Sequence, residues 1–144
     1  MNKNIEIVKE IVINEKFRMD EGIRKNLSIS KLWEYRKIAA ENKDSSSEFL
    51  NKMLRYEVEN EEDADVIDAI LNNPNFRMEE ETRKVLINLG YWKYGELVAK
   101  DKETSSELLN HMLSIETEHL YSLHAMETIL SNPNFKIEEK NKLF

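Results

Sequence analysis

The chain has few residues whose type and spacing suggest acid–base or metal chemistry. Glu116-Thr-Glu-His119 has the Glu-x-x-His spacing of helices that hold a di-iron centre. Such a centre needs a second motif of this kind and two further Glu side chains from other helices. The corresponding segment of the chain, Glu57-Val-Glu-Asn60, ends in an asparagine instead of a histidine. We therefore interpret the motif as a solvated helix face and predict no metal site.

The three histidines do not suggest a catalytic base. His111 follows Glu107 by four residues, which is the spacing of a surface pair on a helix. For His119 and His124, as for His111, the sequence offers neither a nucleophile nor an orienting partner. The chain contains no Cys, which excludes thiol catalysis, disulfides and thiolate metal ligands. We predict no enzymatic activity, no catalytic residues and no cofactor.

Acidic residues gather in one run: Glu57, Glu59, Glu61, Glu62, Asp63, Asp65 and Asp68. This run could attract a basic partner or a weak cation, but it lacks the spacing and the glycine of an EF-hand calcium loop. We interpret it as a solvated linker. The formal net charge of −7 makes nucleic acid an unexpected partner, because nucleic-acid binding depends on Lys and Arg that neutralise phosphates.

Composition favours a helical, soluble domain. Of the 144 residues, 40% are hydrophobic and 34% charged, while only three Gly and two Pro are present, too few for a many-stranded β domain. No apolar run approaches the ~18 residues of a membrane span, and the first residues lack the core of a signal peptide. We expect a cytoplasmic protein, and its richness in Lys, Asn, Ile and Glu suggests a bacterial source.

The elements that position these residues recur at a fixed offset along the chain. Ile70-Leu-Asn-Asn-Pro-Asn-Phe76 returns as Ile129-Leu-Ser-Asn-Pro-Asn-Phe135, and a weaker copy precedes both and ends in Phe17-Arg-Met-Asp-Glu21. Residues 33–57 and 92–116 are identical at 12 of 25 positions. A fixed period of this kind indicates a repeat architecture.

The apolar periodicity predicts about ten amphipathic helices. Ser45-Ser-Ser-Glu48 and Thr104-Ser-Ser-Glu107 have the pattern of a capping box, so we place helix N-caps at Ser45 and Thr104. Asn-Pro-Asn after residues 72 and 131 is interpreted as a structural turn and not as a ligand loop, because Pro ends a helix and Asn supplies turn hydrogen bonds. The predicted helices cover residues 4–13, 20–29, 32–41, 45–54, 64–73, 78–89, 91–101, 105–116, 119–131 and 137–143.

Two phrases of the sequence resemble a known repeat family. They are Ala-x-Asp-x-x-Thr-Ser-Ser-Glu-Leu-Leu at 99–109 and Leu-x-Asn-Pro-Asn at 71–75 and 130–134. Both are similar to the leucine-rich repeat variant group, bacterial repeats related to HEAT-like α-solenoids. The resemblance implies a curved stack of helices that binds macromolecules without catalysis. Some members carry an iron–sulfur cluster on an N-terminal Cys cluster, which this chain lacks.

We therefore expect an all-α, HEAT-like α-solenoid of about ten helices in two and a half 59-residue repeats. It would form a single domain over residues 1–144, with a partial repeat at about 1–32 and further repeats at 33–91 and 92–144. The expected core, on the apolar stripes of these helices, is Ile11, Phe17, Ile38, Leu50, Met53, Leu54, Ile70, Leu71, Phe76, Leu86, Leu97, Leu109, Met112, Leu113, Ile129, Leu130 and Phe135.

The expected function is a non-enzymatic scaffold for protein–protein interaction, with a nucleic-acid-binding or DNA-repair-like HEAT module as the alternative. The candidate partner surface comprises Tyr91, Leu120, Tyr121, Leu123 and Phe144. Tyr91 is an aromatic residue that the repeat does not require, and the next three stand where the first repeat is acidic. Phe144 lies in an apolar end that would favour a homodimer or a partner helix, although it could equally fold back onto the preceding helix.

Overall fold

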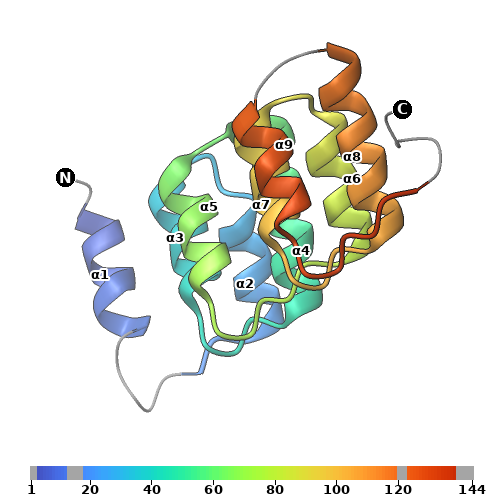
Figure 1. The fold of residues 1–144 in the computed structure, drawn as a ribbon. Helices are drawn as coiled ribbons and strands as arrows, with labels where there is room; N and C mark the ends of the chain where they lie inside the picture. Colours follow the sequence, from blue (N-terminus) through green and yellow to red (C-terminus); the bar gives the residue numbers. More distant parts are fainter. Residues whose placement is uncertain (1–2, 13–17, 120–122, 139–144) are drawn as a thin grey trace. The chain divides into compact units, whose positions relative to one another are not determined.

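The computed structural model describes residues 3–12, 18–119 and 123–138, and every regular element in these ranges is helical (Figure 1). The all-α class is therefore confirmed. The elements are α1 (Lys3–Val12), α2 (Glu21–Ser28), α3 (Trp33–Glu41), α4 (Ser47–Tyr56), the π-helical turn η1 (Glu57–Glu61), α5 (Ala64–Asn72), α6 (Glu80–Asn88), α7 (Trp92–Lys100), α8 (Ser106–His119) and α9 (Leu123–Leu130).

The chain divides into two compact units, Met1–Thr82 and Arg83–Phe144, called here the first and second unit. In the first unit α3 is the central helix, since it packs against α1, α2 and α5. Figure 1 shows α3 between α1 and α5. In the second unit α9 packs against both α7 and α8. The pairs α3·α5 and α7·α9 occupy the same positions of the 59-residue repeat.

Most of the predicted core is buried. Of the expected residues, the structure buries Ile38, Leu50, Met53, Leu54, Ile70, Leu86, Leu109, Met112, Leu113 and Ile129. Leu71, Phe76, Leu97 and Phe135 are only half-buried. Phe17 and the side chain of Ile11 lie outside the described residues.

The prediction that Leu130 belongs to the core is wrong, because its side chain is 49% exposed. Its neighbour Ile129 is fully buried. Consecutive residues of an α-helix point about 100° apart, so the helix that turns Ile129 inward directs Leu130 toward its flank. The apolar pattern of α9 is thus wider than the face that packs in the core of the second unit.

The half-burial of Phe76 lowers the effect expected from its removal. Phe76 and its equivalent Phe135 are both half-buried, whereas a fully buried Phe costs ~3–5 kcal/mol when it is cut to Ala. We expect Phe76→Ala to lower the free energy of unfolding by only about 1–2 kcal/mol, measured by urea denaturation. Phe135→Ala is the matched variant and should lose a similar amount. A loss above about 3 kcal/mol at either position would contradict the half-buried placement.

The N-cap of α4 lies one residue after the predicted position. Ser46 accepts the hydrogen bond from the Phe49 amide, at 3.1 Å. The Ser45 hydroxyl instead donates to the carbonyl oxygen of Ala39 at 2.8 Å and is fully buried. The last carbonyls of a helix have no partner within the helix, so Ser45 satisfies the end of α3 rather than the start of α4.

The second unit repeats this arrangement. Ser105 accepts from the Leu108 amide at 3.1 Å, and the buried Thr104 hydroxyl donates to the carbonyl oxygen of Val98 at 2.7 Å. The prediction of N-caps at Ser45 and Thr104 is therefore wrong by one residue in both copies, although the repeat between the copies holds.

Candidate functional site

The Asn-Pro-Asn turn after α5 ties that helix to the end of α3. The Asn73 amide donates to the carbonyl oxygens of Ala40 at 2.8 Å and Asn42 at 3.1 Å. Asn75 donates to the carbonyl oxygen of Lys43 at 2.8 Å. These bonds satisfy carbonyls that α3 leaves without partners at its end, and they fix where α5 ends relative to α3.

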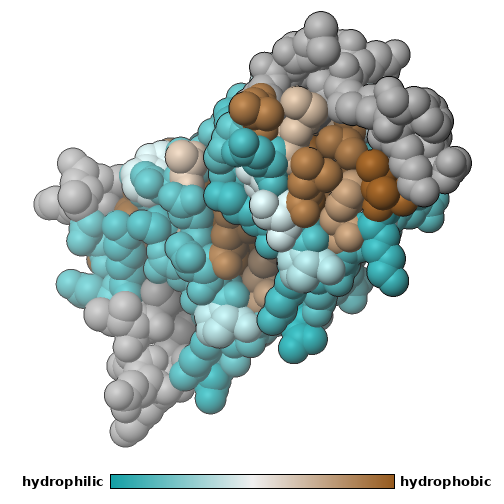
Figure 2. All heavy atoms as spheres, viewed as in Figure 1, coloured by the Kyte–Doolittle hydropathy of each residue, from teal (hydrophilic) through white to brown (hydrophobic). Residues whose placement is uncertain are grey.

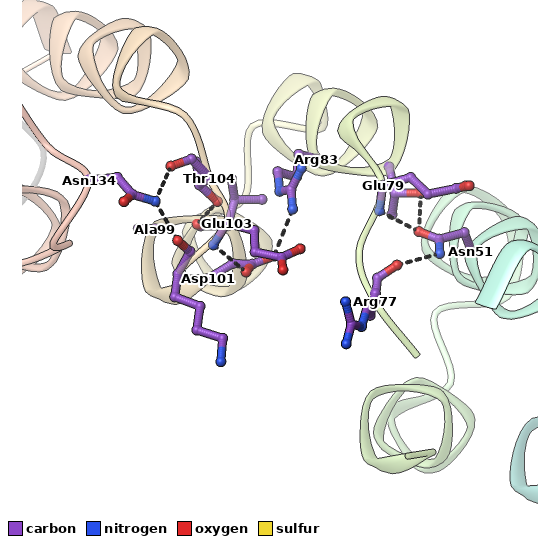
Figure 3. A network of polar contacts seen from close by, with 12 residues as sticks. Asn51, Arg77, Glu79, Arg83, Ala99, Asp101, Glu103, Thr104 and Asn134 are labelled. Carbon is purple, nitrogen blue, oxygen red and sulfur yellow. Dashed lines mark hydrogen bonds and ion pairs between the residues drawn. The ribbon is translucent and has the colours of Figure 1, made fainter. Parts of the chain in front are cut away.

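The turn after α9 makes the same bonds in the second unit. Asn132 donates to the carbonyls of Ala99 at 2.8 Å and Asp101 at 2.9 Å. Asn134 donates to the carbonyl of Lys102, the equivalent of Lys43, and also to the Thr104 carbonyl at 3.0 Å, as Figure 3 shows for the second bond. The structural interpretation of both Asn-Pro-Asn turns is confirmed.

A buried asparagine on α4 holds the segment that leads into α6. The Asn51 amide nitrogen donates to the carbonyl oxygens of Ser47 and Arg77, both at 2.8 Å. Its amide oxygen accepts from the Glu79 backbone at 2.9 Å and from the Thr82 hydroxyl at 2.7 Å. Part of this arrangement is visible in Figure 3. The Asn51 side chain thus links α4, residues 77–79 and α6.

Asn110 repeats this role on α8. It donates to the carbonyls of Ser106 at 2.9 Å and Lys136 at 2.7 Å, and it accepts from the Glu138 backbone at 2.9 Å. Both asparagines are fully buried. The two units therefore share a framework of side-chain-to-backbone hydrogen bonds that recurs once in every repeat period.

Each unit also has an open groove on its surface. The groove of the first unit lies between the end of α3 and one side of α5 and has a volume of about 350 Å³. The groove of the second unit lies between the end of α7 and the same side of α9 and has a volume of about 400 Å³. Each ends at its Asn-Pro turn, at Asn73-Pro74 or Asn132-Pro133. The grooves thus occupy the same positions of the repeat.

The groove of the first unit is acidic. Lys37 and Glu41 form an ion pair across one turn of α3, with 3.6 Å between Nζ and Oε1. Asp65 and Asp68 line the opposite wall on α5, and both are exposed. Lys37 balances one of three carboxylates, which leaves this groove with two formal negative charges.

The groove of the second unit carries a different set of charges at the same positions. Lys100 pairs with Glu96 at 2.5 Å, so the cation and the anion have exchanged places relative to α3. The α9 wall presents His124 and Glu127 where the first unit has two aspartates. The hydrogen bond from Lys100 lowers the pKa of Glu96 below its ordinary value, against the opposing effect of burial, and the charges of Lys100 and His124 lower it further.

The interpretation of the acidic run as a solvated linker is wrong at its first residue. Glu57 is 1% exposed and pairs with Arg36, which is 2% exposed. Nε and Nη2 of Arg36 donate to the two carboxylate oxygens at 3.0 and 3.1 Å. Nη1 of Arg36 donates to the Ser30 carbonyl at 2.9 Å, and the Asp63 amide donates to Glu57 at 3.2 Å. Buried charges require pairing of this kind, because burial otherwise disfavours the charged form.

The rest of the run belongs to helical elements rather than to an irregular linker. Glu59 and Glu61 lie on the π-helical turn η1, Asp63 is the N-cap of α5, and Asp65 and Asp68 lie on α5. The turn η1 ends at Glu61, and its C-cap, Glu62, has a φ of +55°, which lies in the left-handed region. Val58 is buried, while Glu59 and the acids that follow as far as Glu62 are exposed. Burial by itself would lower the pKa of Arg36. The hydrogen bond and charge of Glu57, with the charges of Glu61 and Asp63, outweigh that effect and raise the pKa of Arg36.

The Arg36–Glu57 pair has no copy in the second unit. Gly95 occupies the position of the second repeat that corresponds to Arg36, and a Cβ atom placed on it would lie 3.1 Å from the Trp92 ring. The helical segment that corresponds to η1 is part of α8, which runs as α-helix to His119. One signal in the sequence could have indicated that Arg36 is buried, although not its partner: Arg36 precedes Ala39 and Ala40 by three and four residues, which places it on the same helix face as these small apolar residues.

Two of the five predicted surface residues are described, and both are exposed. Tyr91 is the exposed residue before α7; its ring contacts that of Tyr94 edge-on, with centroids 6.3 Å apart, and the Lys93 ammonium lies over both rings. Leu123 is 68% exposed at the start of α9. Their exposure fits the prediction but does not test a partner. The other predicted residues, Leu120, Tyr121 and Phe144, lie outside the described part of the chain.

The residues considered for chemistry are not assembled into a site. His111 and His124 are exposed, and the side chains of Glu116 and His119 are not described. Within residues 3–12, 18–119 and 123–138, no three His, Cys, Asp or Glu side chains are grouped so that they could hold a metal ion. The same ranges contain no helix with the length and apolar character needed to cross a membrane.

Comparison with known proteins gives no relative from which a function could be transferred. No family model, no curated protein and no solved structure matches the chain.

Proposed function

We propose that this chain is a non-enzymatic scaffold for protein–protein interaction, built as a HEAT-like α-solenoid of the leucine-rich repeat variant type. The observation that carries the proposal is a contrast between two sets of residues within the repeat, those that hold the backbone and those that line the grooves. Residues that hold the backbone recur at the repeat period with the same hydrogen bonds, as with Asn51 and Asn110. Residues that line the grooves change in charge, as with Asp65 and His124.

A constant set of backbone-holding residues beside a variable set of surface residues is typical of repeat proteins. A catalytic site would instead need a fixed set of chemical groups held within a closed pocket. Both grooves are open, and their walls carry charged side chains on long, solvated stems, such as Lys37 and Lys100. Surfaces of this kind suit a polypeptide segment that lies along two helices. We place the scaffold in the cytoplasm of a bacterium on the composition of the sequence.

The alternative, a nucleic-acid-binding or DNA-repair-like HEAT module, receives less support from the grooves. Asp65 and Asp68 line the first and Glu127 the second, and each would repel phosphate. A nucleic-acid interface rests on the opposite charge.

Photo-cross-linking from the groove walls tests the proposal. A photoreactive amino acid is placed at Asn72 or at its equivalent Ser131, both exposed lining residues. The matched controls carry it at Lys52 or at its equivalent His111, exposed residues on α4 and α8. Irradiated in the native cell, the groove variants should form discrete protein adducts that the controls lack.

Two outcomes would argue against the scaffold. Adducts that nuclease digestion removes would support the nucleic-acid alternative. Equal labelling from all four positions would show that the grooves have no preference for a partner. Adducts that are specific to one groove would show, in addition, which set of charges selects the partner.

A further inference from the structure

The first groove lies between two helices that are joined at both ends. Its walls are one side of α3 and one side of α5, and the two helices pack against each other. Where α5 ends, Asn73 donates to the carbonyl oxygens of Ala40 and Asn42 at the end of α3. Where α5 begins, the connection to α3 passes through the buried Arg36–Glu57 pair.

The connection at the start of α5 consists of three hydrogen-bonded steps. Arg36 on α3 donates from Nε and Nη2 to the carboxylate of Glu57. Oε1 of Glu57 also accepts from the Asp63 amide at 3.2 Å. Asp63 is the N-cap of α5, and its Oδ1 accepts from the amides of Asp65 and Val66 at 2.9 and 3.1 Å. The first turn of α5 is therefore fixed relative to α3 through the Glu57 carboxylate.

The π-helical turn η1 is the segment that these bonds hold in place. The Glu62 amide donates to the carbonyl oxygen of Glu57 at 2.7 Å, five residues back instead of the four of an α-helix. Glu62 has a left-handed φ of +55°, which is uncommon for a residue other than glycine. Such a backbone persists only where its surroundings determine it. In η1 these surroundings include the Glu57 carboxylate, which Arg36 and the Asp63 amide both bind.

The repeat can be built without this pair. Gly95 occupies the position of Arg36 in the second unit and has no side chain that could bind a carboxylate. The segment that corresponds to the start of η1 continues α8 as an α-helix to His119. The connection at the other end of the groove is different, because Asn73 has its copy in Asn132. The ion pair is therefore an addition to the first unit and not part of the shared framework.

Stability is a weak reason for such an addition, because apolar side chains of similar size often replace a buried ion pair at little cost. A bidentate pair adds geometry, since the planar guanidinium and the carboxylate fit in one relative orientation. That orientation fixes the start of α5, which carries the groove residues Asp65 and Asp68. Figure 2 shows mainly hydrophilic side chains where Figure 1 places α3 and α5, and polar contacts depend more on position than apolar ones do.

We propose that Arg36 and Glu57 are positioning residues of the first groove, which hold the start of α5 at the distance from α3 that a partner segment requires. The inference rests on the proposed function, since it gives the pair a task only if the groove binds a polypeptide. Without the pair, η1 is free to take the α-helical form of its counterpart, and the α5 wall shifts at its start. Asn73 still holds the end of that wall, so the groove changes shape while the first unit stays folded.

Spin labels on the two walls test the positioning without any partner. The chain contains no Cys, so each label reacts only at an introduced cysteine. One pair of labels replaces Lys37 and Asp65 near the start of the groove, and a second pair replaces Glu41 and Asn72 near its end. Continuous-wave electron paramagnetic resonance then measures the distance between the labels of each pair.

The variant Arg36→Met/Glu57→Leu removes the ion pair and keeps apolar contacts of similar size. In this variant the distance between the start labels should change by about 1.5 Å or more, the rise of one helical residue, while the end labels should not move. Glu48→Leu/Lys52→Met is the matched control, because it removes an exposed ion pair on α4 and should move neither pair of labels.

Far-ultraviolet circular dichroism and urea denaturation establish that each variant is folded. If R36M/E57L is unfolded, Arg36→Lys replaces it, because a lysine keeps the charge but cannot form the bidentate bond. R36K should then move the start labels and leave the end labels in place.

Photo-cross-linking in the native cell tests whether a partner depends on this positioning. Adducts from a photoreactive amino acid at Asn72 should fall by about tenfold in R36M/E57L, as expected when a charged contact with a partner is lost. Adducts from the same amino acid at Ser131, in the second groove, should remain. The control E48L/K52M should change neither set.

The proposal is overturned if the start labels do not move in R36M/E57L, or if they move and the Asn72 adducts persist. An equal loss of adducts from Asn72 and Ser131 would also overturn it, because the loss would then not depend on the first groove. Failure of the scaffold function is a different result: the parent chain, with the ion pair intact, would itself form no adducts from either position.

Discussion

Replacing Asn51 with Ala is expected to lower the free energy of unfolding of the first unit by about 3–4 kcal/mol. The substitution removes the acceptor of the Glu79 amide and of the Thr82 hydroxyl, and it removes one of the two donors to the Arg77 carbonyl, which keeps the bond from the Ser47 hydroxyl. A buried polar group that loses its partner costs ~1–3 kcal/mol. Because Asn51 is fully buried, water does not replace its amide without some opening of the structure.

Urea denaturation measures the loss, and amide hydrogen exchange at Glu79 reports it locally. Asn110→Ala should destabilise the second unit, because Asn110 bonds to the Lys136 carbonyl and the Glu138 amide in the same way. Asn60→Ala is the control: Asn60 lies exposed on η1 and donates to the Tyr56 carbonyl at the end of α4, so the loss should be within about 0.5 kcal/mol. A change at Asn51 as small as that at Asn60 would show that the framework does not depend on the buried amide.

The sequence was sufficient to predict the helical class, most helix positions and the repeat. These features depend on local patterns, namely the 3.6-residue apolar period and the turn chemistry of Asn-Pro-Asn. The self-similarity of the two copies is visible without any structure, and the hydrogen bonds of Asn73 and Asn132 now give its physical basis. Each copy needs the same side chain because each must satisfy the equivalent carbonyls at the end of α3 or α7.

The sequence could not predict features that depend on how one helix packs against another. Ser45 and Ser46 both have the chemistry of an N-cap, and which of them caps α4 depends on the position of the Ala39 carbonyl. Similarly, Leu130 has the apolarity of a core residue, and its exposure depends on which side of α9 meets α7 and α8. These outcomes are set by tertiary packing, which a one-dimensional pattern does not contain.

The grooves could not be predicted from the sequence either. One wall comes from the end of α3 or α7 and the other from one side of α5 or α9, and the sequence does not show that these surfaces face each other. The sequence did indicate that the two copies differ in charge near residues 57–68 and 116–127, and that difference is found in the α5 and α9 walls. It gave no reason to pair Arg36 with Glu57, which are 21 residues apart and look like two solvated charges. The presence of a charged residue in the sequence does not show whether its side chain is buried.

The ion pair of Arg36 and Glu57 carries the other large expected effect. Arg36→Met leaves a buried carboxylate without its cation, and loss of one partner of a buried pair costs ~3–5 kcal/mol. We expect a loss of that size in urea denaturation. The Ser30 carbonyl also loses a hydrogen bond, which would loosen the segment between α2 and α3.

The double variant Arg36→Met/Glu57→Leu separates the strength of the pair from the damage done by breaking it. Apolar side chains of similar size often replace a buried ion pair at little net cost, so we expect the double variant to recover all but about 1–2 kcal/mol. The remaining loss would come from the Asp63 amide and the Ser30 carbonyl, which no longer have a charged partner. A double variant as unstable as Arg36→Met would mean that the π-helical turn itself requires the pair.

The effect of salt concentration on stability tests the burial of the Arg36–Glu57 pair independently. Lys37 and Glu41 form an exposed pair at the edge of the first groove, with 3.6 Å between Nζ and Oε1. Its small contribution to the free energy of unfolding should vanish in ~1 M salt, where the screening length is about 3 Å. The coupling between Arg36 and Glu57, measured as a double-mutant cycle, should persist, because both side chains are shielded from solvent. If salt removed this coupling as well, the pair would have to open to water in solution, and η1 would then be a turn that unfolds locally rather than a fixed part of the first unit.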